Sequence, residues 1–168
     1  FDGGKPYKSI NGGENWFRID PDSLWIWMYT PSGDSIFVNG YPLQSGISAI
    51  GIDPVNTNTI YAGTYGTGYL FKSVDGGSHW MYAGLKAGIT TIEFGTNVSV
   101  IHIGSFWSDL NPTGIFKSTD SGLTWLNNNI GLPDSLNVKR IQICKECNNE
   151  LIFLAGNWID NGGIWKFV

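Results

Sequence analysis

Short apolar runs alternate with clusters of turn-forming residues along the whole chain. The clearest set is Ile47–Ile52, 59–63 and 69–72, which are rich in Ile and Tyr and are separated by Gly, Asn, Asp, Ser and Thr. Runs of this length and composition are typical of β-strands. No segment keeps the apolar period of a helix over several turns. The pattern therefore predicts an all-β chain.

An eight-residue pattern, Ser-x-Asp-x-Gly-x-x-Trp, is repeated along the chain. It occupies residues 73–80 and 118–125 and, with Asn in place of Asp, residues 9–16. Each copy predicts a tight turn between two strands, in which the Ser and Asp side chains bond backbone groups and Gly takes a positive φ. The closing Trp is expected to bury apolar surface. The residues expected to have this structural role are Ser9, Asn11, Gly13, Trp16, Ser73, Asp75, Gly77, Trp80, Ser118, Asp120, Gly122 and Trp125.

These residues resemble the Asp-box, or bacterial neuraminidase repeat (BNR), family. The resemblance is close at 73–80 and 118–125 and weaker at 9–16. It implies a β-propeller built from four-stranded antiparallel blades, with each motif between the third and fourth strands. The family includes sialidases, xyloglucan-degrading glycosidases and sortilin-type receptors, and the motif lies opposite their functional face. The resemblance therefore implies a fold and leaves the activity open.

The repeat spacing predicts how the chain is organised. Trp80 and Trp125 are separated by roughly 45 residues, the length of one blade. We expect a single partial β-propeller domain over 1–168, with about three to four blades. Complete propellers have about four to eight blades, so the remaining blades would come from a longer chain or from a second copy. The expected parts are a blade remnant at 1–19, an inserted hairpin or half-blade at 20–46, a blade at 47–83, a blade at 89–130 and an incomplete blade at 138–168.

Composition narrows the possible partners. Charged residues make up 14% of the chain and the net charge is −4, so we expect no nucleic acid partner, which would need a basic face. No apolar run has the length of a membrane span. Cys144 and Cys147 form one Cys-x-x-Cys, whereas a zinc site needs four ligands, so a turn disulfide or two free thiols is favoured and no metal or cofactor is expected. An extracellular or periplasmic location is expected.

The loops between the second and third strands of each blade are the candidate ligand sites, because they lie opposite the repeated turns. Trp-x-Asp occurs twice in these loops, at Trp107/Asp109 and Trp158/Asp160. Aromatic rings beside carboxylates and amides suit carbohydrate, since sugars stack on rings and donate hydroxyl hydrogen bonds. The alternative is that these Trp side chains only cap the gaps between blades. The candidate ligand-binding residues are Tyr65, Trp107, Trp158, Asn157, Trp25 and Trp27.

Catalysis is a separate question. A glycosidase needs two carboxylates on either side of the scissile bond, and Asp109 with Asp160 is the nominated pair, ahead of Glu93 and Asp134. A sialidase is disfavoured because its three-arginine clamp has no counterpart in a chain with two arginines. The sequence thus predicts a module that recognises carbohydrate or a protein partner. The alternatives are a segment of a glycoside hydrolase acting on polysaccharide and a non-catalytic scaffold or assembly factor.

Overall fold

In the computed structural model the chain is all-β, as predicted. The structure describes residues 6–19, 25–29, 35–39, 46–65, 68–106, 113–133, 136–145, 151–158 and 161–167, and within them every regular element is a strand. The strands are β1 (Tyr7–Lys8), β2 (Phe17–Arg18), β3 (Trp25–Tyr29), β4 (Ser35–Asn39), β5 (Ile47–Ile52), β6 (Ile60–Thr64), β7 (Leu70–Ser73), β8 (Met81–Tyr82), β9 (Gly88–Phe94), β10 (Ile101–Phe106), β11 (Gly114–Ser118), β12 (Leu126–Asn127), β13 (Asn137–Cys144), β14 (Leu151–Trp158) and β15 (Asn161–Phe167).

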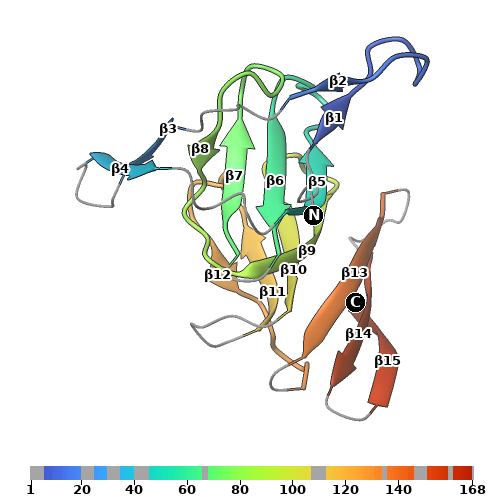
Figure 1. Ribbon diagram of the computed structural model, residues 1–168. Helices are drawn as coiled ribbons and strands as arrows, with labels where there is room; N and C mark the ends of the chain where they lie inside the picture. Colours follow the sequence, from blue (N-terminus) through green and yellow to red (C-terminus); the bar gives the residue numbers. More distant parts are fainter. Residues whose placement is uncertain are drawn as a thin grey trace.

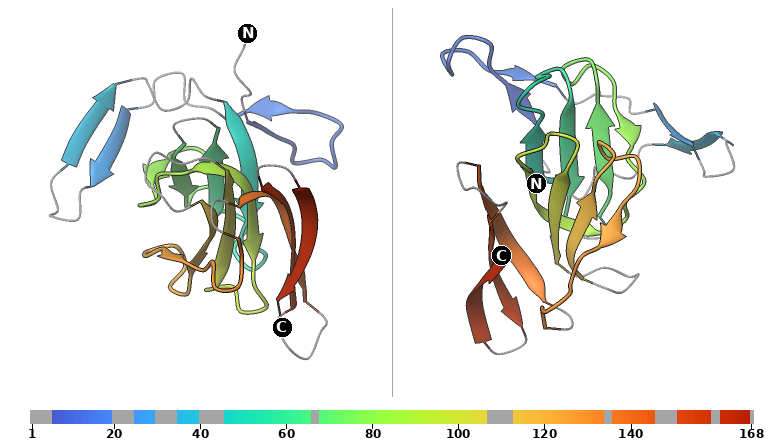
Figure 2. Two further views of the ribbon diagram at one scale, coloured as in Figure 1. Left: turned by 90° about the horizontal axis from the view of Figure 1, so that it is seen from below. Right: turned by 180° about the vertical axis from the view of Figure 1, so that it is seen from behind.

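The strands form separate antiparallel sheets that stand side by side as the blades of a partial β-propeller (Figure 1). β5 to β8 make one four-stranded blade and β9 to β12 make the next, each in chain order. β13 to β15 add a three-stranded sheet, while β1–β2 and β3–β4 are two-stranded hairpins. The first strands of the three larger sheets, β5, β9 and β13, pack against one another in sequence (Figure 2). We call these three strands the inner strands.

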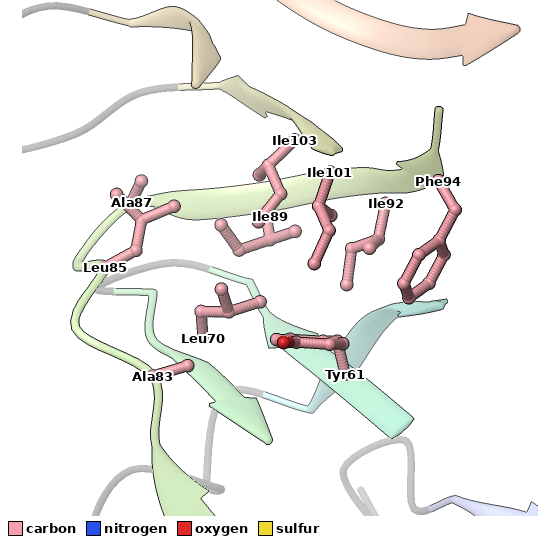
Figure 3. Packing of buried hydrophobic residues seen from close by; sticks show 10 residues of the cluster. All are labelled: Tyr61, Leu70, Ala83, Leu85, Ala87, Ile89, Ile92, Phe94, Ile101 and Ile103. Atoms are coloured by element: carbon pink, nitrogen blue, oxygen red, sulfur yellow. The ribbon is translucent and has the colours of Figure 1, made fainter. Parts of the chain in front are cut away.

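The hydrophobic core lies in the two seams between successive blades. The first seam joins the β5–β8 blade to the β9–β12 blade and contains Tyr61, Leu70, Ile89 and Ile103, all almost fully buried (Figure 3). The second seam joins the β9–β12 blade to the β13–β15 sheet through a separate cluster that includes Ile115, Leu136, Val138 and Ile141. Each blade is therefore stabilised by apolar contact with its neighbours across the sheet faces.

Glycines on the second strand of a blade let the next blade approach closely. A Cβ added at Gly63 on β6 would overlap the side chain of Ile89, and one at Gly104 on β10 would overlap Val138. Ile89 and Val138 stand near the start of the next inner strand in each case. A larger residue at either glycine would force the blades apart, because overpacking a close-packed seam strains both sides.

A side-chain hydroxyl reinforces each seam beside these glycines. Each inner strand has a β-bulge near its start, at Ser48 on β5 and at Thr90 on β9. Ser48 Oγ lies 3.2 Å from the carbonyl oxygen of Gly63 and 2.5 Å from that of Ile89. Thr90 Oγ1 lies 2.9 Å from the carbonyl oxygen of Gly104 and 2.7 Å from that of Val138.

Each hydroxyl therefore bridges its own blade and the next. Its single proton is shared between two carbonyl groups, one on either side of the seam. The bulge is what frees the residue for this role, because it leaves one residue outside the strand pairing.

One strand starts later than its apolar sequence predicts. The run from Val98 favours a strand, yet β10 begins at Ile101. Asn97 holds the preceding residues in a turn, since its side-chain oxygen accepts the amide of Ser99 at 3.0 Å and its carbonyl accepts the amide of Val100 at 2.9 Å. The local asparagine turn competes successfully with the strand propensity of Val98. Residues 25–29 and 35–39 pair as a hairpin, with β3 beside β8.

Thr90→Val tests the hydroxyl bridge. Valine keeps the shape of threonine but leaves two seam carbonyls without their donor, so we expect the free energy of unfolding to fall by about 1–3 kcal/mol. Urea unfolding followed by tryptophan fluorescence measures this loss. Thr119→Val, at an exposed position, is the control and should change stability by less than about 0.5 kcal/mol. Equal losses in the two variants would show that the bridge contributes nothing.

Candidate functional site

The two ends of the blades carry different chemistry. β7 runs from the loop after Thr64 to the repeated turn at 73–80, and β11 runs from the loop after Phe106 to the turn at 118–125. The repeated turns therefore lie at one end of the strands and the loops that follow β6 and β10 lie at the other. We call the three segments 9–16, 73–80 and 118–125 the repeat turns, and the opposite end the loop end.

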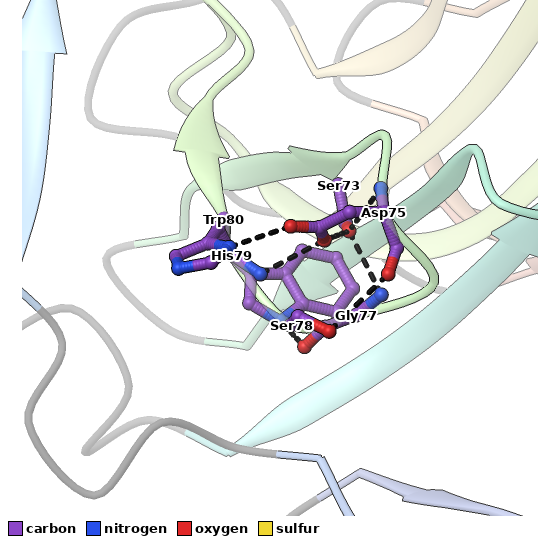
Figure 4. A network of polar contacts seen from close by, with 6 residues as sticks. All are labelled: Ser73, Asp75, Gly77, Ser78, His79 and Trp80. Carbon is purple, nitrogen blue, oxygen red and sulfur yellow. Dashed lines mark hydrogen bonds and ion pairs between the residues drawn. The ribbon is translucent and has the colours of Figure 1, made fainter.

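Each repeat turn is closed by its own side chains, and Figure 4 shows the turn at 73–80. In the turn at 73–80, Ser73 Oγ accepts the Gly77 amide at 2.9 Å and donates to Asp75 at 2.8 Å. Asp75 in turn accepts the His79 amide at 2.9 Å and contacts the His79 ring at 2.6 Å. In the weakest copy, Asn11 accepts the Asn15 amide at 2.9 Å in the same way.

The carboxylates of the repeat turns are committed to these bonds. Hydrogen bonds from the Thr124 side chain and amide lower the pKa of Asp120 to about 2. The His79 amide and ring lower the pKa of Asp75 below its usual range. A carboxylate held ionised by turn donors is a poor general acid, because it holds no proton near neutral pH. This chemistry suits a structural role.

The closing tryptophans differ among the copies. Trp125 packs against the first seam and donates its indole N–H to the carbonyl of Ala83 at 2.8 Å. Trp80 is half-buried and donates to Gly77 at 3.0 Å. Trp16, by contrast, is 62% exposed. β1 and β2 form only a two-stranded sheet among the described strands, so Trp16 has less apolar surface to cover it.

Lysines join two of the repeat turns, 73–80 and 118–125, to the preceding sheet. Lys8 donates to the carbonyl of Gly76 at 3.3 Å, and Lys72 donates to the carbonyl of Ser121 at 3.0 Å. Gly76 and Ser121 occupy the same place in their turns, and both have positive φ, 73° and 58°. The sequence signal for this contact is the lysine directly before the first serine of each copy. The repeat turns therefore link blades as well as closing hairpins.

At the loop end, buried hydroxyls close the bases of two loops, each directly before an aromatic residue. Thr64 Oγ1 accepts the Tyr69 amide at 2.8 Å, and Ser105 Oγ accepts the Gly114 amide at 3.1 Å. Thr64 and Ser105 are both fully buried and each closes the base of the loop that follows its strand. The residues directly after them are Tyr65 and Phe106.

Tyr65 and Phe106 form a stacked pair across two blades. Their ring centroids are 4.3 Å apart and the ring planes differ by 26°. Tyr65 is 53% exposed, so one partner of the stack is open to solvent. The ammonium of Lys139, on the start of β13, lies 5.9 Å from the centre of the Phe106 ring. We call Tyr65, Phe106 and Lys139 the loop-end row.

The row contains one predicted residue and two that were not predicted. The strand register pairs Thr64 with Ile47 and Ser105 with Ile89, which makes Phe106 the residue equivalent to Tyr65. The available signal was the shared Gly-Thr-Tyr and Gly-Ser-Phe endings of the second strands. Lys139 carried no sequence signal of its own.

The other predicted site residues are only partly covered by the structure. Trp107, Asp109 and Asp160 lie outside the described residues, as does Asp134. The remaining four lie on strands whose backbone alone is described: Trp25 and Trp27 on β3, Asn157 and Trp158 on β14.

Glu93 is set apart from the loop-end row. It pairs with His102 near the end of β9, next to Ile101, which pairs with Ser118 at the start of a repeat turn. Glu93 is half-buried, and burial raises the pKa of its carboxyl above the usual range. Its position towards the repeat turns places it at the opposite end of the blade from Tyr65 and Phe106.

The described residues provide neither a metal-binding cluster nor a free thiol at the loop end. Within the described ranges, no group of three or more His, Cys, Asp and Glu side chains is placed to hold a metal ion. Cys144 is disulfide-bonded, and the only other cysteine of the chain, Cys147, lies outside the described residues. In the described part of the chain, no helix has the length and apolar character needed to cross a bilayer.

Comparisons with solved structures identify the same fold. The chain superposes over its full length on a GH74 enzyme from Niastella koreensis, with a TM-score of 0.66 and 25% identity, and covers 25% of that chain. It matches the GH74 xyloglucanase from Xanthomonas campestris with a TM-score of 0.54 and 18% identity, over 70% of this chain and 20% of that one. An ancestral GH74 enzyme gives 0.56 and 22%, over 72% and 17%.

These structures are β-propeller glycosidases, and the chain spans a quarter or less of the length of each. No family model and no curated protein matches the sequence.

The low pKa of Asp120 predicts acid sensitivity of the repeat turns. A carboxyl whose pKa falls from 3.8 when unfolded to about 2 when folded stabilises the fold above pH 3.8, and that contribution is lost as the pH falls towards 2. Asp120→Asn keeps an acceptor oxygen, as Asn11 shows, but cannot titrate. Urea midpoints measured from pH 6 to pH 2 should therefore fall less steeply in this variant than in the unmodified chain. Parallel curves would contradict the assignment.

Proposed function

We propose that the chain is a segment of an Asp-box β-propeller glycoside hydrolase and that its loop end binds the polysaccharide. The observation that carries the proposal is the exposed Tyr65 ring, held in a stack with Phe106 at the end of the blades opposite the repeat turns. A flat aromatic surface held by stacking on a second ring suits the apolar face of a sugar ring.

The comparisons support this proposal over recognition alone. Each similar structure named above is a GH74 enzyme, and one of them is a xyloglucanase. Because the chain covers a quarter or less of each, the activity of a longer protein is itself part of the proposal. The contribution of this chain would be to bind and orient the polymer, since contacts at several sugars of a long substrate hold the bond to be cleaved in position.

Asp109 and Asp160 remain the proposed catalytic carboxylates. In a retaining enzyme the two groups would be about 5–5.5 Å apart, and in an inverting enzyme about 6.5–9.5 Å apart. Asp109→Asn and Asp160→Asn should each abolish release of reducing ends while leaving polymer binding within about twofold, because an amide oxygen can accept a hydrogen bond from a sugar hydroxyl but an amide cannot transfer a proton. Full hydrolysis by either variant would remove that residue from the catalytic pair.

An extracellular or periplasmic location is proposed on the same grounds. The disulfide at Cys144 requires an oxidising compartment to persist. Polysaccharides too large to enter a cell would be met in that compartment.

Tyr65→Ala tests the binding surface. Removing the exposed ring should weaken binding of xyloglucan by roughly threefold to tenfold, the equivalent of about 0.5–1.5 kcal/mol for an aromatic contact. Isothermal titration calorimetry with xyloglucan oligosaccharides measures the change, and Tyr65→Phe should retain most of the affinity.

Tyr7→Ala is the matched control for this experiment. Tyr7 is 55% exposed, close to the value for Tyr65, but lies on the β1–β2 hairpin. Its replacement should leave the affinity unchanged. If Tyr65→Ala binds as well as the unmodified chain, the loop end is not the binding surface.

A further inference from the structure

The three inner strands carry different residues at one equivalent position. Each strand has its bulge at the same place, which holds Ser48 in β5, Thr90 in β9 and Lys139 in β13. In the first two strands the residue is a hydroxyl that bridges two blades. Lys139 keeps the bulge but replaces the hydroxyl with a long cationic side chain.

The glycine beside the bridge is also replaced at this position. Gly63 pairs with Ala49 and Gly104 pairs with Thr91, whereas the corresponding pair in the third sheet is Ala155 with Arg140. The third sheet therefore lacks both the bridging hydroxyl and the glycine that the other two blades use at their seams. A departure from a rule that the rest of a fold obeys often marks a position selected for function.

The ammonium of Lys139 turns back to the preceding blade. It lies over the Phe106 ring, 5.9 Å from its centre, and Lys139 itself is exposed. Among the described residues, no carboxylate is within ion-pair distance of this ammonium. Tyr65, Phe106 and Lys139 come from three consecutive sheets, so the row passes from an open aromatic ring to a positive charge along the direction in which blades succeed one another.

We propose that the loop-end row binds a polysaccharide that carries carboxylate groups, such as a uronic acid polymer. The aromatic pair would stack a sugar ring, and the Lys139 ammonium would pair with the carboxylate of the same or the adjacent sugar. The chain as a whole is acidic, with a net charge of −4, so an anionic ligand gains only from a local cation of this kind. This inference rests on the proposed function, and it narrows the class of polymer that the loop end binds.

The alternative role of Lys139 is structural. A lysine over a phenylalanine ring can simply cover apolar surface and gain a weak cation–π contact. In that case the charge would cover Phe106 without engaging a ligand, and affinity for neutral and acidic polymers would be the same.

The experiment compares two probes that differ only in charge. Cellohexaose and its C6-oxidised form, in which the primary alcohols are carboxylates, are titrated into the unmodified chain by calorimetry at low and high salt. The oxidised form should bind more tightly by roughly twofold to fivefold, the range for an exposed ion pair. The preference should shrink at high salt. Lys139→Thr should remove the preference, so that the two probes bind this variant with the same affinity.

Matched variants separate the possible failures. Lys139→Thr introduces the residue that β9 uses at this bulge, so it should fold with an unfolding temperature equal to or above that of the unmodified chain. Lys145→Thr removes a lysine just beyond the other end of β13 and should keep the preference. Tyr65→Ala should weaken both probes equally.

Two results would overturn the proposal. Equal binding of the two probes by the unmodified chain, or a preference that survives in Lys139→Thr, would assign Lys139 to a structural role while the proposed function stands. If the chain binds neither these probes nor xyloglucan, the proposed function itself is wrong and this inference falls with it.

Discussion

The whole structure depends on how one blade meets the next. A single blade cannot bury its hydrophobic face alone, and most of the buried hydrophobic residues in the described part of the chain belong to the two seams between sheets. Those seams close only because Gly63 and Gly104 leave room for Ile89 and Val138. The hydroxyls of Ser48 and Thr90 then bridge to the carbonyls of the same two residues. Apolar contact and hydrogen bonding thus converge on one residue per seam.

The repeat turns add further hydrogen bonds between neighbouring sheets, at the end of the blades opposite the loop end. Lys8 and Lys72 reach across to the turn of the following blade, and Tyr61 donates its hydroxyl to Ser121 at 2.6 Å in the same region. Burial raises the pKa of the Tyr61 hydroxyl well above its ordinary value, so it stays a donor at all physiological pH. In the first seam, Ser48 bonds across near the loop end and Lys72 bonds across at the repeat turn, so both ends of that seam are held.

The sequence predicts the local features of this molecule far better than the contacts between blades. The turns at 73–80 and 118–125 follow from the Ser, Asp and Gly spacing because the bonds that their Ser and Asp side chains make join residues at most four positions apart. The Ser48 and Thr90 bridges join residues 41 and 48 positions apart. No local sequence pattern predicts these bonds. The bulges also shift the register, so the equivalence of Tyr65 with Phe106 emerges only from strand pairing.

The first and last inner strands, β5 and β13, expose side chains of different chemistry: β5 exposes apolar side chains and β13 exposes cations. Ile50 on β5 corresponds to Ile92 on β9, yet Ile50 is 47% exposed while Ile92, covered by the preceding blade, is 6% exposed. The face of β5 therefore suits a blade that offers a small residue and a hydroxyl, as β5 and β9 themselves do to their successors. β13 instead offers Lys139 and Arg140, both exposed.

β13 therefore lacks the small residue and the hydroxyl that β5 and β9 present to the next blade, and its Lys139 turns back to Phe106 of the preceding blade instead. The described strands include no blade after the β13–β15 sheet, so they supply no carbonyl for a hydroxyl at the β13 bulge to bond. A cation can therefore replace the hydroxyl at this position.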